Sequence, residues 1–542
     1  MTRQIRMKKG NFINRNKLQA VSGLAIAVCF LLKIIVIQRK IGNTGTGFYM
    51  TTFAFVAAVM MLFAKTFREV LKKAISYRKS RGQYKNALKM MRTGAVSALI
   101  FGLVIFLIML ALSSRMTNVV FHLGAYGTFP MIMIALSVPF LLFAYSLLGC
   151  FDGFGFEVAE GAAKIIFAVT DLLLGIAFLF LSCMAGKQHA MLLHDDRVTD
   201  AFGAVGAAAG FTGAAIITAV WMICLARVFC KKIKPMAAED MGRSQESFLE
   251  QITGLVSAAG FPLLRYFALF GAFMANQFLF FRCMRSMEAS QVFGSFLAEN
   301  FIWFILPVLM AVLLGDYFRE YLEKVMKKDD IYHAGMRIVM GTKQYLCVIL
   351  PMVCITGIVF PCLNRSVFKE AESANALPAI LFFACLCLVL LLDSMLRGIG
   401  RDRIGMICAL AAFLIQTVTA GFLFSKKCSV DTLWYTNLIF IFIFLLGSMA
   451  FTIRFCVYKK NLAKHLLLPF AATAGAVLTA VLCLLLKAVI GNLPAALIAM
   501  FMSFLIHALV LVVSGCIKES EIQEFPQSGL LNLIGRTLGI YN

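Results

Sequence analysis

Long apolar stretches recur along the whole chain, and their length predicts its architecture. Five of the clearest are residues 18–37, 95–113, 164–183, 406–424 and 433–453. An α-helix rises about 1.5 Å per residue, so about 20 apolar residues cross a hydrocarbon core of about 30 Å. No connection exceeds about 30 residues, which is too short for a soluble domain of ordinary size. The pattern predicts an all-α, polytopic membrane protein.

About fourteen membrane-spanning helices follow from this pattern, each placed to within a few residues. The predicted spans are 18–37, 48–64, 94–113, 128–149, 164–183, 203–226, 252–281, 291–314, 344–361, 376–396, 404–424, 433–453, 466–486 and 494–516. The spans 48–64 and 291–314 are the weakest of these predictions.

The basic residues lie mainly between the spans and predict the orientation of the chain. The net charge is +24. With the N-terminus in the cytoplasm, the inner segments hold about 37 Lys and Arg and the outer segments about 12, as the positive-inside rule requires. We therefore expect a multi-pass protein of the cell membrane with both termini cytoplasmic. The bases indicate contact with anionic membrane lipids rather than with nucleic acid.

Several classes of chemistry have no motif in this sequence. Most of the sixteen cysteines lie inside apolar stretches and none forms a C-x-x-C pair, which argues against a disulfide framework or a zinc site. The sequence contains no P-loop motif and no H-E-x-x-H motif. We predict no enzymatic activity, no cofactor and no metal. Coupling to an ion gradient or to the membrane potential stays open, as does the oligomeric state, for which a monomer is the default.

Two glycine-containing turns suggest an internal repeat. Gly153 and Gly155 follow one apolar helix, and Gly398 and Gly400 follow another at an offset of about 245 residues. In both places a short charged turn and a new helix come next. Two six-helix bundles with the same orientation would be parallel repeats.

This organisation gives a domain scheme. It consists of a basic N-terminus 1–17, a first bundle 18–226, a linker 227–251, a second bundle 252–453, two further helices within 466–516 and a tail 517–542. The N-terminus, linker and tail are expected in the cytoplasm. The tail is either an interfacial amphipathic helix or a frayed end.

Charged residues inside the spans are the first candidates for function, because an ionisable group is costly in lipid. Arg265 lies near the middle of its span and cannot lose its charge, so it needs a polar cavity or an acid. Lys33 either snorkels to the outer headgroups or faces a cavity with Arg39. If Lys33 and Arg265 line one cavity, their charge favours a phosphate or carboxylate substrate.

Polar residues in other spans complete the candidate site. Glu299, next to Asn300, is expected to pair with a base or to bind a coupling cation. Asp393 is placed near the inner end of its span, where it can pair with Arg397 or Arg401. Asn276 is a further candidate for substrate contact. The turn glycines and Asp393 are candidates for gating.

Several stretches resemble a known family. Residues 39–49, RKIGNTGTGFY, resemble the turn between helices 1 and 2 of polysaccharide transporters, and residues 74–84 resemble their following basic loop. The two glycine turns and the Gly/Ala-rich stretch 203–213 fit as well. Together they are similar to the stage V sporulation protein B branch of the multidrug/oligosaccharidyl-lipid/polysaccharide (MOP) flippase superfamily.

The resemblance implies two bundles that rock around a central cavity and flip an undecaprenyl-linked sugar or a peptidoglycan precursor. It implies a basic residue in helix 1, which Lys33 matches. Ala27 and Asn300 stand where lipid II flippases of this group tend to have further basic residues, which separates the chain from them.

Three other functions compete with the flippase interpretation. A drug/cation antiporter of the same superfamily usually carries acids in helices 1 and 7, where this chain has Lys33 and Arg265. An enzyme of envelope sugar assembly would need a large outer loop, and every predicted outer loop is short. A scaffold for envelope assembly would not need a charged cavity.

Overall fold

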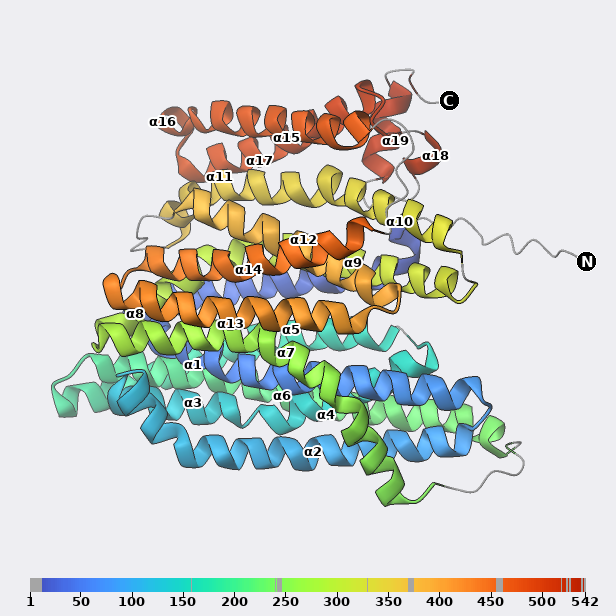
Figure 1. Ribbon diagram of the computed structural model, residues 1–542. Helices are drawn as coiled ribbons and strands as arrows, with labels where there is room; N and C mark the ends of the chain where they lie inside the picture. Colours follow the sequence, from blue (N-terminus) through green and yellow to red (C-terminus); the bar gives the residue numbers. More distant parts are fainter. Residues whose placement is uncertain are drawn as a thin grey trace, which may run out of the picture.

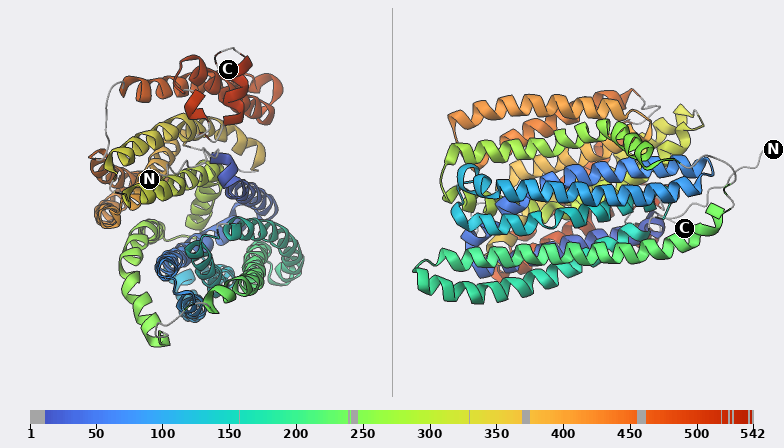
Figure 2. Two further views of the ribbon diagram at one scale, coloured as in Figure 1. Left: turned by 90° about the vertical axis from the view of Figure 1, so that its right-hand side faces the viewer. Right: turned by 90° about the horizontal axis from the view of Figure 1, so that it is seen from below.

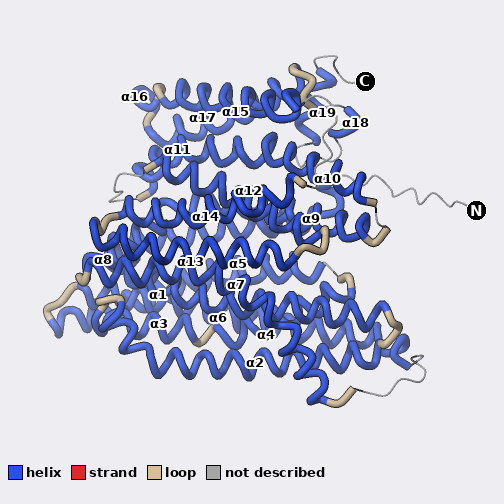
Figure 3. The backbone as a smooth tube through the Cα atoms, in the orientation of Figure 1, coloured by secondary structure: helices blue, strands red, loops and turns tan. Residues whose placement is uncertain are grey.

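The computed structural model describes residues 12–156, 158–238, 240, 246–328, 330–368, 375–454, 462–517, 519–522, 525, 528–537 and 540. All regular secondary structure in these ranges is helical (Figure 3), so the predicted all-α fold is confirmed. Part of the predicted N-terminus, the centre of the predicted linker and part of the tail lie outside the described residues.

The first helix of the fold, α1 (Phe12–Ser80), doubles back on itself at Gly42. The φ angle of Gly42 is +59°, in the left-handed region that favours glycine. The rings of Phe30 and Phe53 lie 6.0 Å apart, whereas a straight helix would separate them by roughly 35 Å. The first two predicted spans are therefore two antiparallel limbs of α1.

Two groups of helices pack as lobes, which the end-on view in the left panel of Figure 2 separates. The first lobe contains α1, α2 (Tyr84–Arg115), α3 (Thr128–Ala135), α4 (Val138–Phe154), α5 (Val158–Leu193) and α6 (Arg197–Ala238). The second contains α8 (Glu288–Phe296), α9 (Ile305–Met326), α10 (Ile331–Gln344), α11 (Leu350–Val367), α12 (Ala376–Gly398), α13 (Asp402–Lys426) and α14 (Val430–Ile453). Short π or 3₁₀ turns at Met116–Val120, Gly124–Gly127, Leu297–Phe301, Ile302–Phe304 and Tyr345–Ile349 join or interrupt these helices.

The helix α7 (Phe248–Met284) connects the lobes and bends along its length (Figure 1). A capping box at Ser247 and Glu250 fixes its start. Its first part is tied to the first lobe, since the Gln251 side chain accepts a 2.8 Å hydrogen bond from Thr93. Pro262 removes one backbone donor inside the helix, which permits a bend there. Beyond Pro262, α7 packs against α1 of the first lobe and α13 of the second, and we count this part of it with the second lobe.

Thirteen helical segments in the described ranges are long and apolar enough to cross a membrane. Twelve of them hold one crossing each, and the segment in α1 holds two because of its turn at Gly42. The structure thus agrees with the predicted fourteen crossings. Helices α5, α6 and α7 extend past their predicted apolar spans, because the polar residues beside those spans also favour the helical conformation.

The glycine turns that suggested a repeat have matching surroundings in the two lobes. Gly155 and Gly400 both have a positive φ, of +81° and +75°. A Cβ on Gly153 would lie 3.0 Å from the carbonyl oxygen of Lys72, and one on Gly398 would lie 2.9 Å from that of Arg319. In each lobe the first glycine thus lets two helices touch and the second ends a helix.

Two helices follow the second lobe and pack on α11. They are α15 (Leu462–Leu484) and α17 (Asn492–Val513), joined by the short α16 (Lys487–Ile490). The tail forms α18 (Glu519–Ile522) and α19 (Ser528–Thr537), and Lys343 of α10 pairs with Glu521 at 2.6 Å. Leu531 and Ile534 are buried. In its described part, the tail is therefore a short helix tied to α10 and an amphipathic helix, α19, that packs on α17.

Candidate functional site

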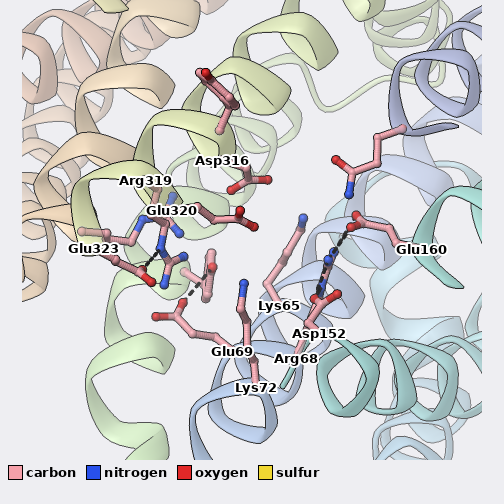
Figure 4. Close-up of a pocket in the computed structure, with 14 residues that line it drawn as sticks. Lys65, Arg68, Glu69, Lys72, Asp152, Glu160, Asp316, Arg319, Glu320 and Glu323 are labelled. Atoms are coloured by element: carbon pink, nitrogen blue, oxygen red, sulfur yellow. Dashed lines mark hydrogen bonds and ion pairs between the residues drawn. The ribbon is translucent and has the colours of Figure 1, made fainter. Parts of the chain in front are cut away.

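A pocket of about 220 Å³ lies between the two lobes, at the end of the molecule where α4 and α12 terminate (Figure 4). The first lobe contributes residues of α1, α4 and α5, and the second contributes residues of α7, α9 and α12. Most of the lining side chains are charged. A concave site with convergent polar groups is the default place for a ligand.

Two helices supply the opposing walls of this pocket, and they do so with the same spacing. The α1 face consists of Lys65, Arg68, Glu69 and Lys72, and the α9 face consists of Asp316, Arg319, Glu320 and Glu323. Positions i, i+3, i+4 and i+7 lie on one side of an α-helix, so each set points in one direction. The apolar part of each helix ends just before these residues.

Ion pairs fix part of the first wall. Arg68 binds Asp152 of α4 and Glu160 of α5, with 2.7 Å between nitrogen and oxygen in both pairs. Glu160 also pairs with Lys164 at 2.8 Å. Lys65 and Lys72 point into the pocket (Figure 4), and neither forms an ion pair or hydrogen bond with any residue in the described ranges. These two ammonium groups are therefore available to a ligand.

Contacts between the lobes flank the same pocket. Glu69 accepts a 3.1 Å hydrogen bond from the hydroxyl of Tyr266 on α7. Lys73 lies 2.8 Å from Asp402 of α13 and 3.1 Å from Glu69. Of these contacts, Tyr266–Glu69 and Lys73–Asp402 join the lobes, whereas Lys73 and Glu69 both belong to α1. The Lys73–Asp402 pair is solvent-exposed and worth at most about 1 kcal/mol, so separating it costs little.

A second, apolar pocket of about 300 Å³ lies further along α1 and α7, which both contribute to the charged pocket as well. Its walls carry Ala54, Ala57, Ala58, Met61, Phe270, Phe273, Phe293, Phe296 and Phe301, among others. Asn276, Gln277 and Asn437 are its polar residues. A charged pocket and an aromatic pocket thus follow one another between the lobes.

The lobes meet closely at the opposite end, near the turn of α1. A Cβ on Gly47 would lie 2.6 Å from the carbonyl oxygen of Ser290, and one on Gly294 would lie 2.5 Å from the Cα of Gly47. The side chain of Gln291 donates a 3.0 Å hydrogen bond to Thr44. Only residues without a side chain permit this approach, so the contact closes this end.

Lys33 lies inside the first lobe and not on the wall of either pocket between the lobes. Its ammonium is 2.6 Å from Asp171 of α5, and the two side chains are 1% and 7% exposed. The ring of Tyr49 lies 5.3 Å away. A Cβ on Gly175 would lie 2.8 Å from Lys33 Cε, so this glycine provides the space for the lysine. Burial to this extent excludes snorkelling to a headgroup.

Arg265 and Asp393 form a buried ion pair between α7 and α12. Asp393 also lies 3.4 Å from Arg397, one of the two partners that the sequence suggested for it. Arg265 is therefore in the second lobe and Lys33 in the first. Whether these two bases share a cavity was open from the sequence. In the structure they do not, and other side chains line the charged pocket.

The remaining predicted residues divide between the pockets and the closed end. Asn276 lines the aromatic pocket and donates a 2.7 Å hydrogen bond to Asn437. Glu299 and Asn300 are buried in the π turn before α9, and the Asn300 amide donates to Phe296. Arg39 donates a 3.0 Å hydrogen bond to the carbonyl of Val367, across the lobes at the closed end.

The repeat also relates the interiors of the two lobes. Lys33 and Asp171 join α1 to α5, and Asn276 and Gln416 join α7 to α13 by a hydrogen bond. These helices correspond in the two bundles, at an offset close to that of the glycine turns. At these corresponding positions, the first lobe thus holds a charged pair and the second holds two amides.

Sequence reasoning missed the walls of the charged pocket because it assigned their residues to loops. Lys65 directly follows a predicted span, and Asp316 follows another. The signal that identifies them is the spacing i, i+3, i+4, i+7, since four charges at these positions indicate a continuing helix with one charged face.

The comparisons with known proteins identify the fold. No protein-family model matches the chain, and no curated protein matches it. Among solved structures, it resembles an inward-facing multidrug resistance MATE family transporter of the MOP superfamily: TM-score 0.59, 13% identity, 80% of this chain and 98% of the other covered.

Two further structures agree. A MOP superfamily transporter from Pyrococcus furiosus, described as having a binding pocket of reverse polarity, gives a TM-score of 0.57 at 14% identity over 84% and 98% of the two chains. A eukaryotic MATE transporter gives 0.56 at 14% identity over 85% and 99%. The chain therefore has the fold of MATE transporters of the MOP superfamily. Its resemblance to the polysaccharide branch stays a prediction.

Proposed function

We propose that this chain is a transporter that moves a lipid-linked oligosaccharide or a cell-envelope precursor across the cell membrane by alternating access. The observation that carries the proposal is the order of the two pockets between the lobes. A charged pocket suits a phosphorylated, sugar-bearing head, and the aromatic pocket next to it suits an apolar chain.

The closed contact at Gly47 and Gly294 and the pocket at the other end fit one state of such a cycle. By the positive-inside rule, the pocket lies at the cytoplasmic end. We infer an inward-facing state in which substrate enters from the cytoplasmic leaflet. Rocking of the lobes would separate the glycine contact and close the charged mouth.

A flipping assay in proteoliposomes tests the proposal. The substrate is a fluorescent undecaprenyl-pyrophosphate sugar, and the readout is its protection from a membrane-impermeant quencher. We compare the wild type with Lys65→Gln/Lys72→Gln, which removes the two unpaired cations. Lys324→Gln is the matched control, because this exposed lysine of α9 does not line the pocket. Flipping by the wild type and the control but not by the double variant supports the proposal.

A drug/cation antiporter of the same superfamily is the second candidate, favoured by the aromatic lining of the second pocket. Five phenylalanines there would stack on a planar lipophilic cation. Uptake of such a cation against a proton gradient, together with no flipping of the lipid-linked sugar, would select the antiporter over the flippase.

A further inference from the structure

The two walls of the charged pocket share their spacing but have opposite charge. The α1 face carries three bases and one acid, which gives a formal charge of +2. The α9 face carries one base and three acids, which gives −2. The pocket is thus polarised from one lobe to the other, although the sum over both faces is zero.

Local ion pairs leave this polarity in place on the α1 side. Each acid there has a cation within reach: Asp152 and Glu160 bind Arg68, and Glu69 binds Lys73. The charges that remain are those of Lys65 and Lys72, which lie two turns apart on the same side of α1.

On the opposite wall, Arg319 pairs with Glu323 at 2.8 Å, and Arg397 lies beside Asp393. Asp316 is exposed to the pocket and faces Lys65 across it (Figure 4), without an ion pair to any described residue. The pocket therefore presents two ammonium groups on one side and a carboxylate on the other.

We propose that the ligand of this pocket is an amphipathic zwitterion, with a phosphate or carboxylate bound by Lys65 and Lys72 and an ammonium group bound by Asp316. The proposal rests on the transport function proposed above and names the charge of its substrate. A head with only negative charge would face the carboxylates of the α9 wall, and a head with only positive charge would face the two lysines. Each would leave one wall desolvated without a partner, whereas a zwitterion pairs both.

Equilibrium binding of three matched ligands tests the assignment. The probes share a hexyl chain and carry a phosphocholine, a phosphate monoester or a trimethylammonium group. They are titrated into the purified full-length protein in a neutral maltoside detergent. In the wild type we expect the zwitterion to bind about tenfold more tightly than either singly charged ligand.

Variants then test which wall of the pocket binds the anionic group of the ligand and which binds its cationic group. Lys65→Gln should shift the preference toward the cation, and Asp316→Asn toward the anion. The exchange Lys65→Asp with Asp316→Lys should restore zwitterion binding that Lys65→Asp alone abolishes, because both charges are again present. Lys324→Gln should match the wild type, and thermal melting confirms that each variant is folded.

Other results overturn the assignment. If the zwitterion binds no better than the anion or the cation, including no measurable binding of all three, the proposal is wrong. Charged faces that only close the mouth of the transporter predict variants that change all three affinities equally, which contradicts it too. Since these assays measure binding, a failure to flip the lipid-linked sugar overturns the flippase proposal and not this one.

Discussion

The buried pair Lys33–Asp171 makes a strong quantitative prediction, because its two charges have so little contact with water. Replacing Lys33 by methionine keeps most of the side-chain volume and removes the ammonium that lies 2.6 Å from the carboxylate. Removal of one partner of a buried pair usually costs about 3–5 kcal/mol, because the other charge is left unpaired.

The cost has an upper limit, since Asp171 can take up a proton instead. A carboxylic acid with an ordinary pKa of about 3.9 requires about 4 kcal/mol to be protonated at pH 7 and about 1.5 kcal/mol at pH 5. We therefore expect Lys33→Met to lower the free energy of unfolding by about 4 kcal/mol at pH 7 and by about 1.5 kcal/mol at pH 5. Lys33→Met with Asp171→Leu should come within about 1 kcal/mol of the wild type at both pH values, since neither charge remains.

The assay is reversible unfolding of the purified protein in mixed detergent, followed by circular dichroism at the two pH values. The four proteins form a double-mutant cycle: wild type, Lys33→Met, Asp171→Leu and the double variant. A loss of stability in Lys33→Met that does not decrease from pH 7 to pH 5 would refute the reasoning. So would a double variant whose loss equals the sum of the two single losses.

Three further predictions concern other contacts. Arg265→Ala should lower the free energy of unfolding by about 3 kcal/mol, because it removes the main partner of the buried Asp393 carboxylate. We also expect it to abolish transport. Thermal melting checks the first effect and the flipping assay the second. Gly47→Ala should open the closed end and raise the thiol reactivity of a single cysteine placed in the turn of α1, whereas Gly254→Ala, whose Cβ meets nothing within 4 Å, should not. The hydrogen bond from Tyr126, followed by the backbone N–H of Arg197, holds the pKa of Asp195 below its usual range. A group whose pKa is lowered in the folded state stabilises the fold at pH values above its ordinary pKa, and this stabilisation is lost as the pH falls through the folded-state pKa. The difference in stability between the wild type and Tyr126→Phe should therefore be constant above about pH 4 and vanish below it; unfolding at a series of pH values measures it.

The two glycine turns illustrate how far sequence comparison reaches into the fold. Gly153 and Gly398 could be matched because a helix end, a tight turn and a new helix leave a local signature. Their role in letting α4 touch α1 and α12 touch α9 depends on neighbours far away in the sequence. The same holds for Gly47 and Gly294, where no local pattern indicates that two backbones meet.

The sequence by itself determined the features that depend on transfer from water to lipid. Apolar stretches of about 20 residues set the number of crossings, and the bases between them predict the orientation. Each of these features depends on the summed hydrophobicity or charge of a short segment, so no knowledge of how the helices pack is needed.

Only the tertiary structure decided which charges face each other. Lys33 and Arg265 stand out in the sequence because each is alone in an apolar stretch, yet each finds a buried acid on another helix, Asp171 and Asp393. The charged pocket is instead made where two helices continue past the apolar region and turn their charged sides toward one another. A side chain's partner in a bundle is set by helix rotation and by the contact between lobes, and neither quantity can be read from a single segment.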